Sequence, residues 1–277
     1  MILLVVGADR VDAGKTTFSA GLLSRTGGAG YKPRAGNDYW FDHDDCLNAL
    51  ADGRLYGKDA ARLASAEGDG REPELLNPVH RLWRPSPDGG TGLLGRQDRE
   101  FVVDRVRTPD GDDTFVVNAT AAVPDRVART LPLADAVPVE TVEELNAAIE
   151  RRYVPAFEDL AVRIEAEPLA VVESYGDVAM PLQSLEHSAV AAVAAVEPGR
   201  VRIYPGHRFC RACEVARSSP REGQLEKRVP DVIDYLDPLE RLSVPPLSGD
   251  DRTDPDRIAD AYGPAYDALL EAARSSQ

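Results

Sequence analysis

One stretch of the sequence, VVGADRVDAGKTTFSAGLL at residues 5–23, constrains the fold more than any other. An apolar run leads into a glycine-containing loop, and the letters GKTT then open a stretch in which Phe18, Leu22 and Leu23 recur near helical spacing. A short apolar run bounded by glycine is typical of a buried parallel strand, and the spacing after it predicts a helix. We therefore expect the chain to open with a strand, a loop and a helix, which is typical of α/β folds.

The loop between this strand and helix is a candidate phosphate site. Backbone N–H groups and the positive end of a helix dipole together bind phosphate oxygens. In the pattern G-x-x-x-x-G-K-[ST], the lysine reaches the β- and γ-phosphates and the next hydroxyl binds magnesium. Here Asp9 stands where the pattern has its first glycine, and six residues separate Gly7 from Gly14. The longer loop changes how the backbone would surround a β-phosphate. The alternative to a phosphate site is a helix that merely begins at Gly14. The candidate nucleotide-binding residues are Gly7, Asp12, Ala13, Gly14, Lys15, Thr16 and Thr17.

Further strands and helices alternate along the first half of the chain. Residues 30–36 predict a second short strand that Pro33 helps to end, because proline lacks a backbone N–H. Helical patterns follow at 44–53 and 56–68, and Gly53 separates them. Two valine-rich runs within residues 99–120 flank Pro-Asp-Gly, which is a hairpin signature, and we interpret this hairpin as an insertion or an antiparallel edge.

The second half continues the alternation. A long helical tract is predicted over residues 141–168, with a kink at Pro155, and a buried strand that ends in a carboxylate over 169–177. The remaining expected elements are strands at 189–199 and 200–206 and a closing helix at 254–274. The stretch at 189–199 is rich enough in alanine to be a helix instead.

These elements predict a three-layer α/β fold with a mostly parallel central sheet, flanked by helices on both faces. We expect a single domain over residues 1–277, with the β-hairpin insertion at about 86–140. The most linker-like stretches are 84–96 and 244–256.

The charge of the chain limits its partners. The formal net charge is −15, from 47 acidic against 32 basic residues, and lysine occurs only at positions 15, 32, 58 and 227. Such a surface argues against non-specific binding to nucleic acid or anionic membranes. We interpret it as adaptation to a salty cytoplasm, as in halophilic organisms; the alternative is an ordinary acidic enzyme.

The apolar segments and the cysteines predict a cytoplasmic protein. The run over residues 1–6 is too short for a signal peptide and has no basic region before it, and no stretch approaches the roughly 20 apolar residues that span a bilayer. Three cysteines, Cys46, Cys210 and Cys213, cannot form a disulfide framework, which fits a reducing compartment.

Four stretches in the same order resemble a known family. Lys32-Pro33, FDHDDCLNAL at 41–50, ELLNPVHRLWRP at 74–85 and VVESYGDVAMPL at 171–182 are similar to segments of dethiobiotin synthetase and cobyrinic acid a,c-diamide synthase. Both belong to the P-loop NTPase superfamily of the MinD type. The resemblance to dethiobiotin synthetase covers roughly residues 1–85 and 168–195, and the chain as a whole also resembles an archaeal group described as predicted P-loop ATPases or GTPases.

The resemblance implies a P-loop NTPase fold and a magnesium–nucleotide site. In it, Lys15 and Thr16 hold phosphate and Mg²⁺, and Glu173 with Asp44 or Asp45 completes the metal shell. One or two carboxylates are a sensible ligand set for Mg²⁺, which keeps several waters. The alternatives are that Glu173 simply ends a buried strand, and that Asp44 and Asp45 are acidic residues stabilising the start of a helix.

The resemblance also places a substrate beside the nucleotide. Lys32 would face an acceptor, and Lys32 with the neighbouring Arg34 would suit an anionic substrate; the alternative is an ordinary surface lysine. Ser174-Tyr175 stand where the family has a glycine-rich turn, so the dethiobiotin reaction is not our first choice. The residues implied to be catalytic are Lys15, Lys32 and Glu173.

A separate cluster, GHRFCRACE at residues 206–214, spaces His207, Cys210 and Cys213 three residues apart. The three side chains could serve zinc or part of an iron–sulfur site, or a redox pair, but a fourth ligand is not evident nearby. The alternative is a helix with small buried thiols.

Two classes of function follow. The first is an enzyme that hydrolyses ATP or GTP, or transfers its γ-phosphoryl group, with the ATP-dependent ligase as the sharper variant. The second is a nucleotide-operated switch of the MinD type, in which Arg10 would serve in a homodimer. A polynucleotide kinase is disfavoured because the chain has no basic stripe. The guanine-reading N-K-x-D motif is absent, which favours ATP without excluding GTP.

Overall fold

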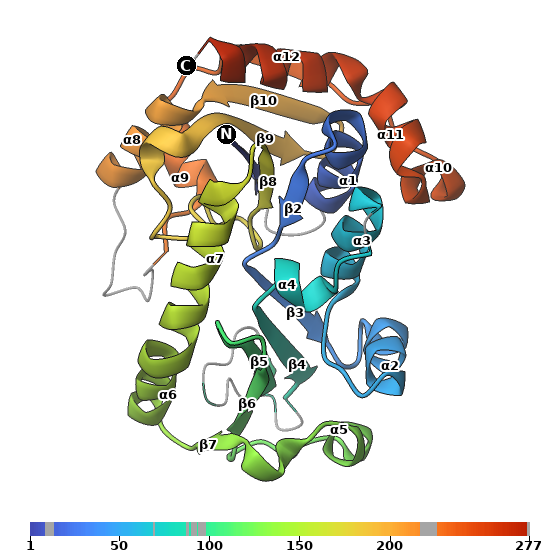
Figure 1. Ribbon diagram of the computed structural model, residues 1–277, viewed down its shortest axis with the longest axis vertical. Coiled ribbons are helices and arrows are strands. Elements are labelled where there is room, and N and C mark those ends of the chain that lie inside the picture. Colours follow the sequence, from blue (N-terminus) through green and yellow to red (C-terminus); the bar gives the residue numbers. More distant parts are fainter. Residues whose placement is uncertain are drawn as a thin grey trace. The chain divides into compact units, whose positions relative to one another are not determined.

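The computed structural model describes residues 1–8, 14–68, 70–86, 89, 93, 98–216 and 226–275. They form an α/β structure with two mixed β-sheets flanked by helices (Figure 1). The chain divides into two compact units: the first contains Met1–Pro33, Arg62–Arg71 and Ala161–Gln277, and the second contains Arg34–Ala61 and Glu72–Leu160. Each unit contains one of the two sheets.

The sheet of the first unit has the strand order β11-β10-β9-β1-β8-β2. Strand β1 pairs in parallel with β8 and β9, β2 pairs in parallel with β8, and β10 is antiparallel to β9 and β11. Because Val5 of β1 lies opposite Glu173 and Gly7 lies opposite Val196, the carboxyl ends of three parallel strands meet at one edge of the sheet. The strands are β1 (Ile2–Gly7), β2 (Ala29–Tyr31), β8 (Ala170–Glu173), β9 (Val190–Glu197), β10 (Arg200–Pro205) and β11 (Glu240–Ser243).

Helices cover this sheet. Helix α1 (Lys15–Thr26) packs with Phe18, Leu22 and Leu23 buried, and Phe18 stacks edge-on against Tyr266 of α12. Figure 1 shows α12 on one side of β10 and β9, and α8 and α9 on the other. The other helices of this unit are α8 (Gly206–Val215), α9 (Val229–Ile233), α10 (Gly249–Thr253), α11 (Pro255–Ala261) and α12 (Gly263–Arg274), with a short 3-10 turn at His187–Ala189.

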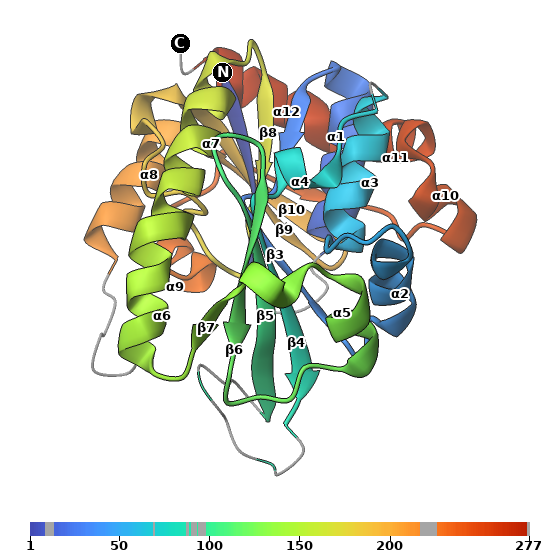
Figure 2. The same cartoon turned by 60° about the horizontal axis from the view of Figure 1, so that its bottom comes forward.

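The sheet of the second unit has the order β3-β4-β5-β6-β7 (Figure 2). Its outer pairs, β3–β4 and β6–β7, are parallel, whereas β4–β5 and β5–β6 are antiparallel. One apolar cluster joins the sheet to α2 and α5, and a second joins it to α6. The elements are β3 (Arg34–Asp38), β4 (Val79–Pro85), β5 (Arg99–Arg107), β6 (Asp113–Asn118), β7 (Val137–Val139), α2 (His43–Ala51), α4 (Pro73–Leu76), α5 (Asp125–Thr130), α6 (Val142–Ala148) and a 3-10 turn at Leu133–Asp135. Helices α3 (Lys58–Glu67) and α7 (Val154–Ala166) each begin in this unit and end in the first.

A buried guanidinium anchors the second unit. Arg105 is fully buried and donates hydrogen bonds to the carbonyl oxygens of Leu55 (2.8 Å), Pro78 (3.3 Å) and Asn77. Burial lowers the pKa of Arg105, because removal from water penalises its charged form. These hydrogen bonds pair the buried charge of Arg105 with three backbone carbonyls, so Arg105 has a structural role.

Most expected elements are confirmed. The strand and helix that flank the GKTT letters are β1 and α1, the two helical patterns near Gly53 are α2 and α3, and the carboxylate-ended strand is β8. The alanine-rich stretch is a strand, β9, and all eight of its residues are buried. The hairpin is formed by β5 and β6, but it is central in its sheet and not at an edge.

The helical tract predicted at 141–168 is confirmed: it is helical from Val142 to Ala166, with a π-helical turn, Ile149–Tyr153, between α6 and α7, and the kink at Pro155 stays a prediction. Two expectations need correction. The strand predicted at 30–36 ends at Tyr31, and after Pro33 the chain enters the second sheet as β3, because Pro33 has no N–H to continue the first ladder. The closing helix is two helices, α11 and α12, since Gly263-Pro264 begin a new one.

The organisation of the sheets is only partly as expected. Three of the five strand pairings described in the first sheet are parallel, as predicted, but the second sheet, half parallel and half antiparallel, was not predicted. The expected insertion at about 86–140 falls inside the second unit, which is longer at both ends. A single P-loop domain over the whole chain stays a prediction. Among the described helices, none has the length and apolarity needed to cross a bilayer.

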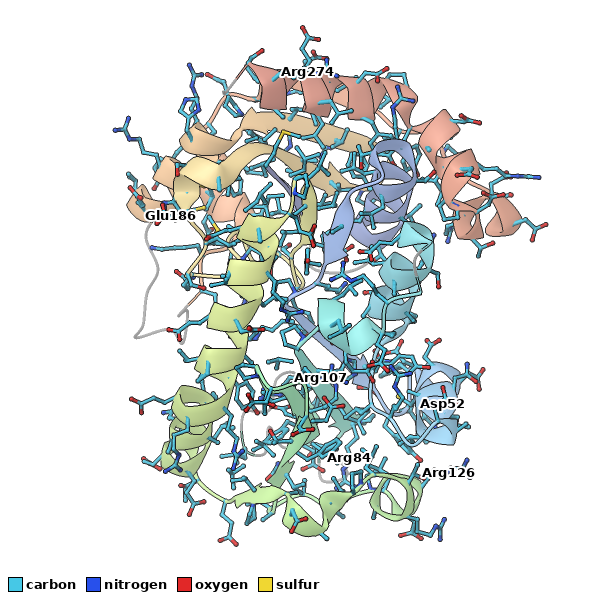
Figure 3. All side chains as sticks on the ribbon, viewed as in Figure 1. Asp52, Arg84, Arg107, Arg126, Glu186 and Arg274 are labelled. Carbon is cyan, nitrogen blue, oxygen red and sulfur yellow. The ribbon has the colours of Figure 1, made fainter. Side chains whose placement is uncertain are left out.

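The surface is rich in charge. Asp52, Arg126, Glu186 and Arg274 all stand exposed on the ribbon (Figure 3). Several surface charges are paired, such as Arg25 with Asp267 at 2.5 Å. Exposed pairs of this kind contribute at most about 1 kcal/mol each.

Candidate functional site

The candidate site lies in the first unit, where β1 and β8 end and α1 begins. In open α/β sheets, ligands bind beyond the carboxyl ends of the parallel strands. Gly14 precedes α1 in the left-handed conformation, with φ of 83°, which glycine adopts without a steric penalty. The first turn of α1 has no acidic side chain and no side-chain cap. Its backbone N–H groups have no partner within the helix, so this end is suited to an anion.

Glu173 is the centre of the site. Its side chain is fully buried at the end of β8. The carboxylate atom Oε1 accepts a hydrogen bond from Thr16 Oγ1 at 2.8 Å and from Lys32 Nζ at 2.6 Å. The register explains the second contact, because Tyr31 lies opposite Val172 and the next residues of the two strands are therefore neighbours. Lys32 is only 4% exposed, so Lys32 and Glu173 form a buried ion pair beside the start of α1.

Two buried oxygen atoms of the site have no hydrogen-bond partner among the described residues. They are Glu173 Oε2 and Ser174 Oγ. Buried polar groups normally have a partner, and an exception calls for an explanation such as a bound ion or ligand. A carboxylate oxygen beside a threonine hydroxyl is a donor set that Mg²⁺ prefers. The residues present therefore fit the magnesium ion that the resemblance implies.

Lys15 lies across the end of β1. Its Nζ donates to the carbonyl oxygen of Gly176 at 2.8 Å, in the turn that follows Glu173. A Cβ atom on Gly7 would lie 2.7 Å from Lys15 Nζ and 2.9 Å from this carbonyl oxygen. Glycine at position 7 therefore leaves the space through which the lysine passes.

The other predicted nucleotide-binding residues are described in part. Thr17, in the first turn of α1, accepts a hydrogen bond from Arg62 Nη1 at 3.3 Å. Arg62 was missed by the sequence analysis, because a single arginine in an amphipathic helix carries no signal of its own. Asp12 and Ala13, like Asp9 and Arg10, lie outside the described residues.

The acidic segment belongs to the second unit. Asp44 and Asp45 stand in the first turn of α2, where acidic side chains stabilise a helix through its dipole. Lys58 Nζ lies 3.1 Å from Asp42 and 3.5 Å from Asp45. These contacts agree with the helix-stabilising alternative. A metal role for Asp44 or Asp45 stays a prediction.

The histidine and cysteine cluster lies on α8. Cys210 and Cys213 are buried, whereas His207 is exposed. Burial raises the pKa of Cys210 to about 11 and that of Cys213 to about 12, so both are neutral thiols near pH 7. In the part of the chain that the structure describes, no three His, Cys, Asp or Glu side chains are grouped to hold a metal ion, so the zinc or iron–sulfur hypothesis gains no support.

A cavity of about 360 Å³ lies beyond the carboxyl ends of β1 and β9. It is on the opposite side of β1 from β8 in the strand order. Arg200 and Arg202 both pair with Glu197 at its wall. The lining residues are Ala8, Glu197, Pro198, Arg200, Arg202, Pro230, Ile233 and Asp234.

Comparisons with protein-family models, with curated proteins and with solved structures find no match to this chain. The structure itself defines the class: an α/β protein with two mixed sheets and a buried lysine–glutamate pair where two parallel strands of the first sheet end.

Proposed function

We propose that the chain is a P-loop nucleoside triphosphatase that binds Mg–ATP or Mg–GTP and uses it to phosphorylate or activate a small anionic substrate. The observation that carries the proposal is the position of Glu173. The buried carboxylate of Glu173, at the end of a parallel strand, accepts a hydrogen bond from the hydroxyl of Thr16. Its second oxygen has no hydrogen-bond partner among the described residues. The same order of residues gives the resemblance to dethiobiotin synthetase.

Phosphate binding is assigned to the start of α1. The N–H groups of its first turn and the dipole attract an anion, and Lys15 supplies a full positive charge beside them. Thr16 and Glu173 would hold the magnesium ion. When bound, this ion would neutralise charge on the β- and γ-phosphates.

The acceptor is assigned to the side of β8 and β2. Lys32 is a compact cation held by Glu173, and it suits a carboxylate, carbamate or phosphate group on a small substrate. Holding the acceptor in line with the γ-phosphate provides most of the catalysis in phosphoryl transfer, because positioning and charge stabilisation dominate that reaction.

The base and ribose are assigned to the cavity beside Ala8. Its volume of about 360 Å³ lies in the range of small-molecule sites, and it adjoins the strand end from which the phosphate loop departs. The acceptor and the base would then occupy opposite sides of β1.

The proposal is tested by binding and hydrolysis of ATP and GTP. We expect the substitution Lys15→Ala to weaken binding about ten- to a hundredfold, since a charge-assisted hydrogen bond contributes about 1.5–3 kcal/mol. Glu173→Ala should abolish magnesium-dependent turnover. Lys58→Ala removes a lysine that is 58% exposed in the second unit and serves as the control. Equal nucleotide binding by the wild type and Lys15→Ala would refute the proposal, and nucleotide-dependent dimerisation would favour a switch over a ligase.

A further inference from the structure

The cavity beside Ala8 combines apolar walls with charged groups of both signs. Its volume is about 360 Å³, and all of its lining residues belong to the first unit. Arg202 of β10 and Asp234, which follows α9, both line it. Apolar walls with a few polar groups are typical of sites for small molecules. The apolar lining residues are Ala8, Pro198, Pro230 and Ile233.

The guanidinium of Arg202 is held in place by Glu197. The Glu197 side chain is only 8% exposed; its Oε1 accepts a hydrogen bond from Arg202 Nη2, and its Oε2 accepts one from Arg200 Nε. Both oxygens of Glu197 are therefore bonded within the protein. Arg202 Nε is buried and has no hydrogen-bond partner among the described residues. Arginine donates hydrogen bonds and accepts none, so Arg202 supplies the cavity with donors that the described protein groups do not fully use.

Asp234 supplies the cavity with acceptors. Its side chain is exposed, and within the described part of the chain it forms no hydrogen bond or ion pair. An ionised carboxylate accepts hydrogen bonds at two neighbouring oxygens and donates none. The polar groups that the cavity offers a ligand are thus donors from Arg202 and a pair of acceptors from Asp234.

We propose that this cavity binds guanine in preference to adenine, so that the nucleotide of the proposed function is GTP; the inference rests on that function. Guanine has two neighbouring donors, N1–H and the 2-amino group, which match the two oxygens of Asp234. Its acceptors O6 and N7 are the usual partners of an arginine. Adenine has an amino group in place of O6 and an unprotonated N1. It would therefore set a donor against Arg202 and an acceptor against Asp234.

The test measures the Kd of Mg–GTP, Mg–ATP and Mg–XTP, the xanthosine nucleotide, for the wild type and for Asp234→Asn. The wild type should bind Mg–GTP about tenfold or more tightly than Mg–ATP. Xanthine has a carbonyl oxygen in place of the 2-amino group, and an asparagine amide can donate to it. Asp234→Asn should therefore lose about tenfold in affinity for Mg–GTP and prefer Mg–XTP.

Asp231→Asn is the matched control. It removes the same charge from an exposed position of α9 that does not line the cavity, and it should keep the wild-type Kd for all three nucleotides. Inosine triphosphate provides a test that needs no variant, because its base keeps N1–H and O6 but lacks the 2-amino group. It should bind the wild type more weakly than GTP, and equal affinity would overturn the contact with Asp234.

The outcomes separate this inference from the proposed function. If Lys15→Ala weakens binding while the wild type binds Mg–ATP at least as tightly as Mg–GTP, the preference for guanine is overturned and the function stands. If GTP is preferred but Asp234→Asn changes no Kd more than Asp231→Asn does, the role of Asp234 is overturned. If Lys15→Ala binds nucleotides like the wild type, the function fails and the inference fails with it.

Discussion

The buried pair of Lys32 and Glu173 gives the sharpest test of how the first unit is held together. Its atoms are 2.6 Å apart, and the two side chains are 4% and 0% exposed. Removing one partner of a buried pair leaves a charge without compensation and costs about 3–5 kcal/mol. We therefore expect Glu173→Gln and Lys32→Met each to lower the free energy of unfolding by about that amount. The double variant leaves no unpaired charge and should be more stable than either single one, which makes the coupling energy about 3 kcal/mol or more.

The assay must report on the first unit. Denaturant unfolding followed by circular dichroism gives the total change, and hydrogen exchange of peptides that contain β8 and α1 gives the local one. The pair of Lys58 and Asp42 is the matched control, since Lys58 is 58% exposed and the coupling there should stay below about 1 kcal/mol. If the two single costs at Lys32 and Glu173 add up to that of the double variant, the buried pair is not coupled and the reasoning is wrong.

Four further predictions follow from the structure and the net charge. A Cβ on Gly7 would lie 2.7 Å from Lys15 Nζ, so Gly7→Ala should weaken nucleotide binding nearly as much as Lys15→Ala. A Cβ on Gly14 would meet no atom within 4 Å, but Gly14 has a φ of 83°, so Gly14→Ala should lower the free energy of unfolding by about 1–2 kcal/mol, measured by denaturation. The pKa values of Cys210 and Cys213 are raised to about 11 and 12 from 9.0, so these two thiols stay protonated to a higher pH in the folded state than in the unfolded state. The stabilisation is complete below pH 9 and declines as the pH rises towards 12; unfolding at pH 8 and pH 10 should show a decline that the double alanine variant reduces. Finally, the net charge of −15 should make the protein more stable in molar KCl than in dilute buffer, and greater stability at low salt would contradict the interpretation as a salt adaptation.

The sequence predicts the centre of the site well because its signals are local. An apolar run, a glycine loop and a helical pattern identify β1 and α1, and a valine pair before Glu173 identifies a strand that ends in a carboxylate. Because β8 lies next to β1 in the sheet, the carboxyl ends of these parallel strands bring Thr16 and Glu173 together. The contact of Lys32 with Glu173 needs the strand order as well, since it depends on β2 lying next to β8.

The features that were missed lack such signals. Strand β3 has the sequence RAGND, which carries neither an apolar run nor alternation, so its membership of a second sheet is decided by pairing with β4. Arg62 is 45 residues from Thr17 in sequence, and only the tertiary fold brings them together. The composition of β9 suits a helix or a strand equally, and its place between β1 and β10 settles the matter.

The strand order also determines when the first unit can fold during synthesis. Strand β1 leaves the ribosome first, yet its two partners, β8 and β9, begin at Ala170 and Val190. At roughly 5–20 residues per second, the apolar β1 waits on the order of ten seconds or more for its neighbours. All of the second unit, from Arg34 to Leu160, is made within that interval. The candidate site is thus assembled from segments that precede and follow the second unit in the sequence, after that unit has been made.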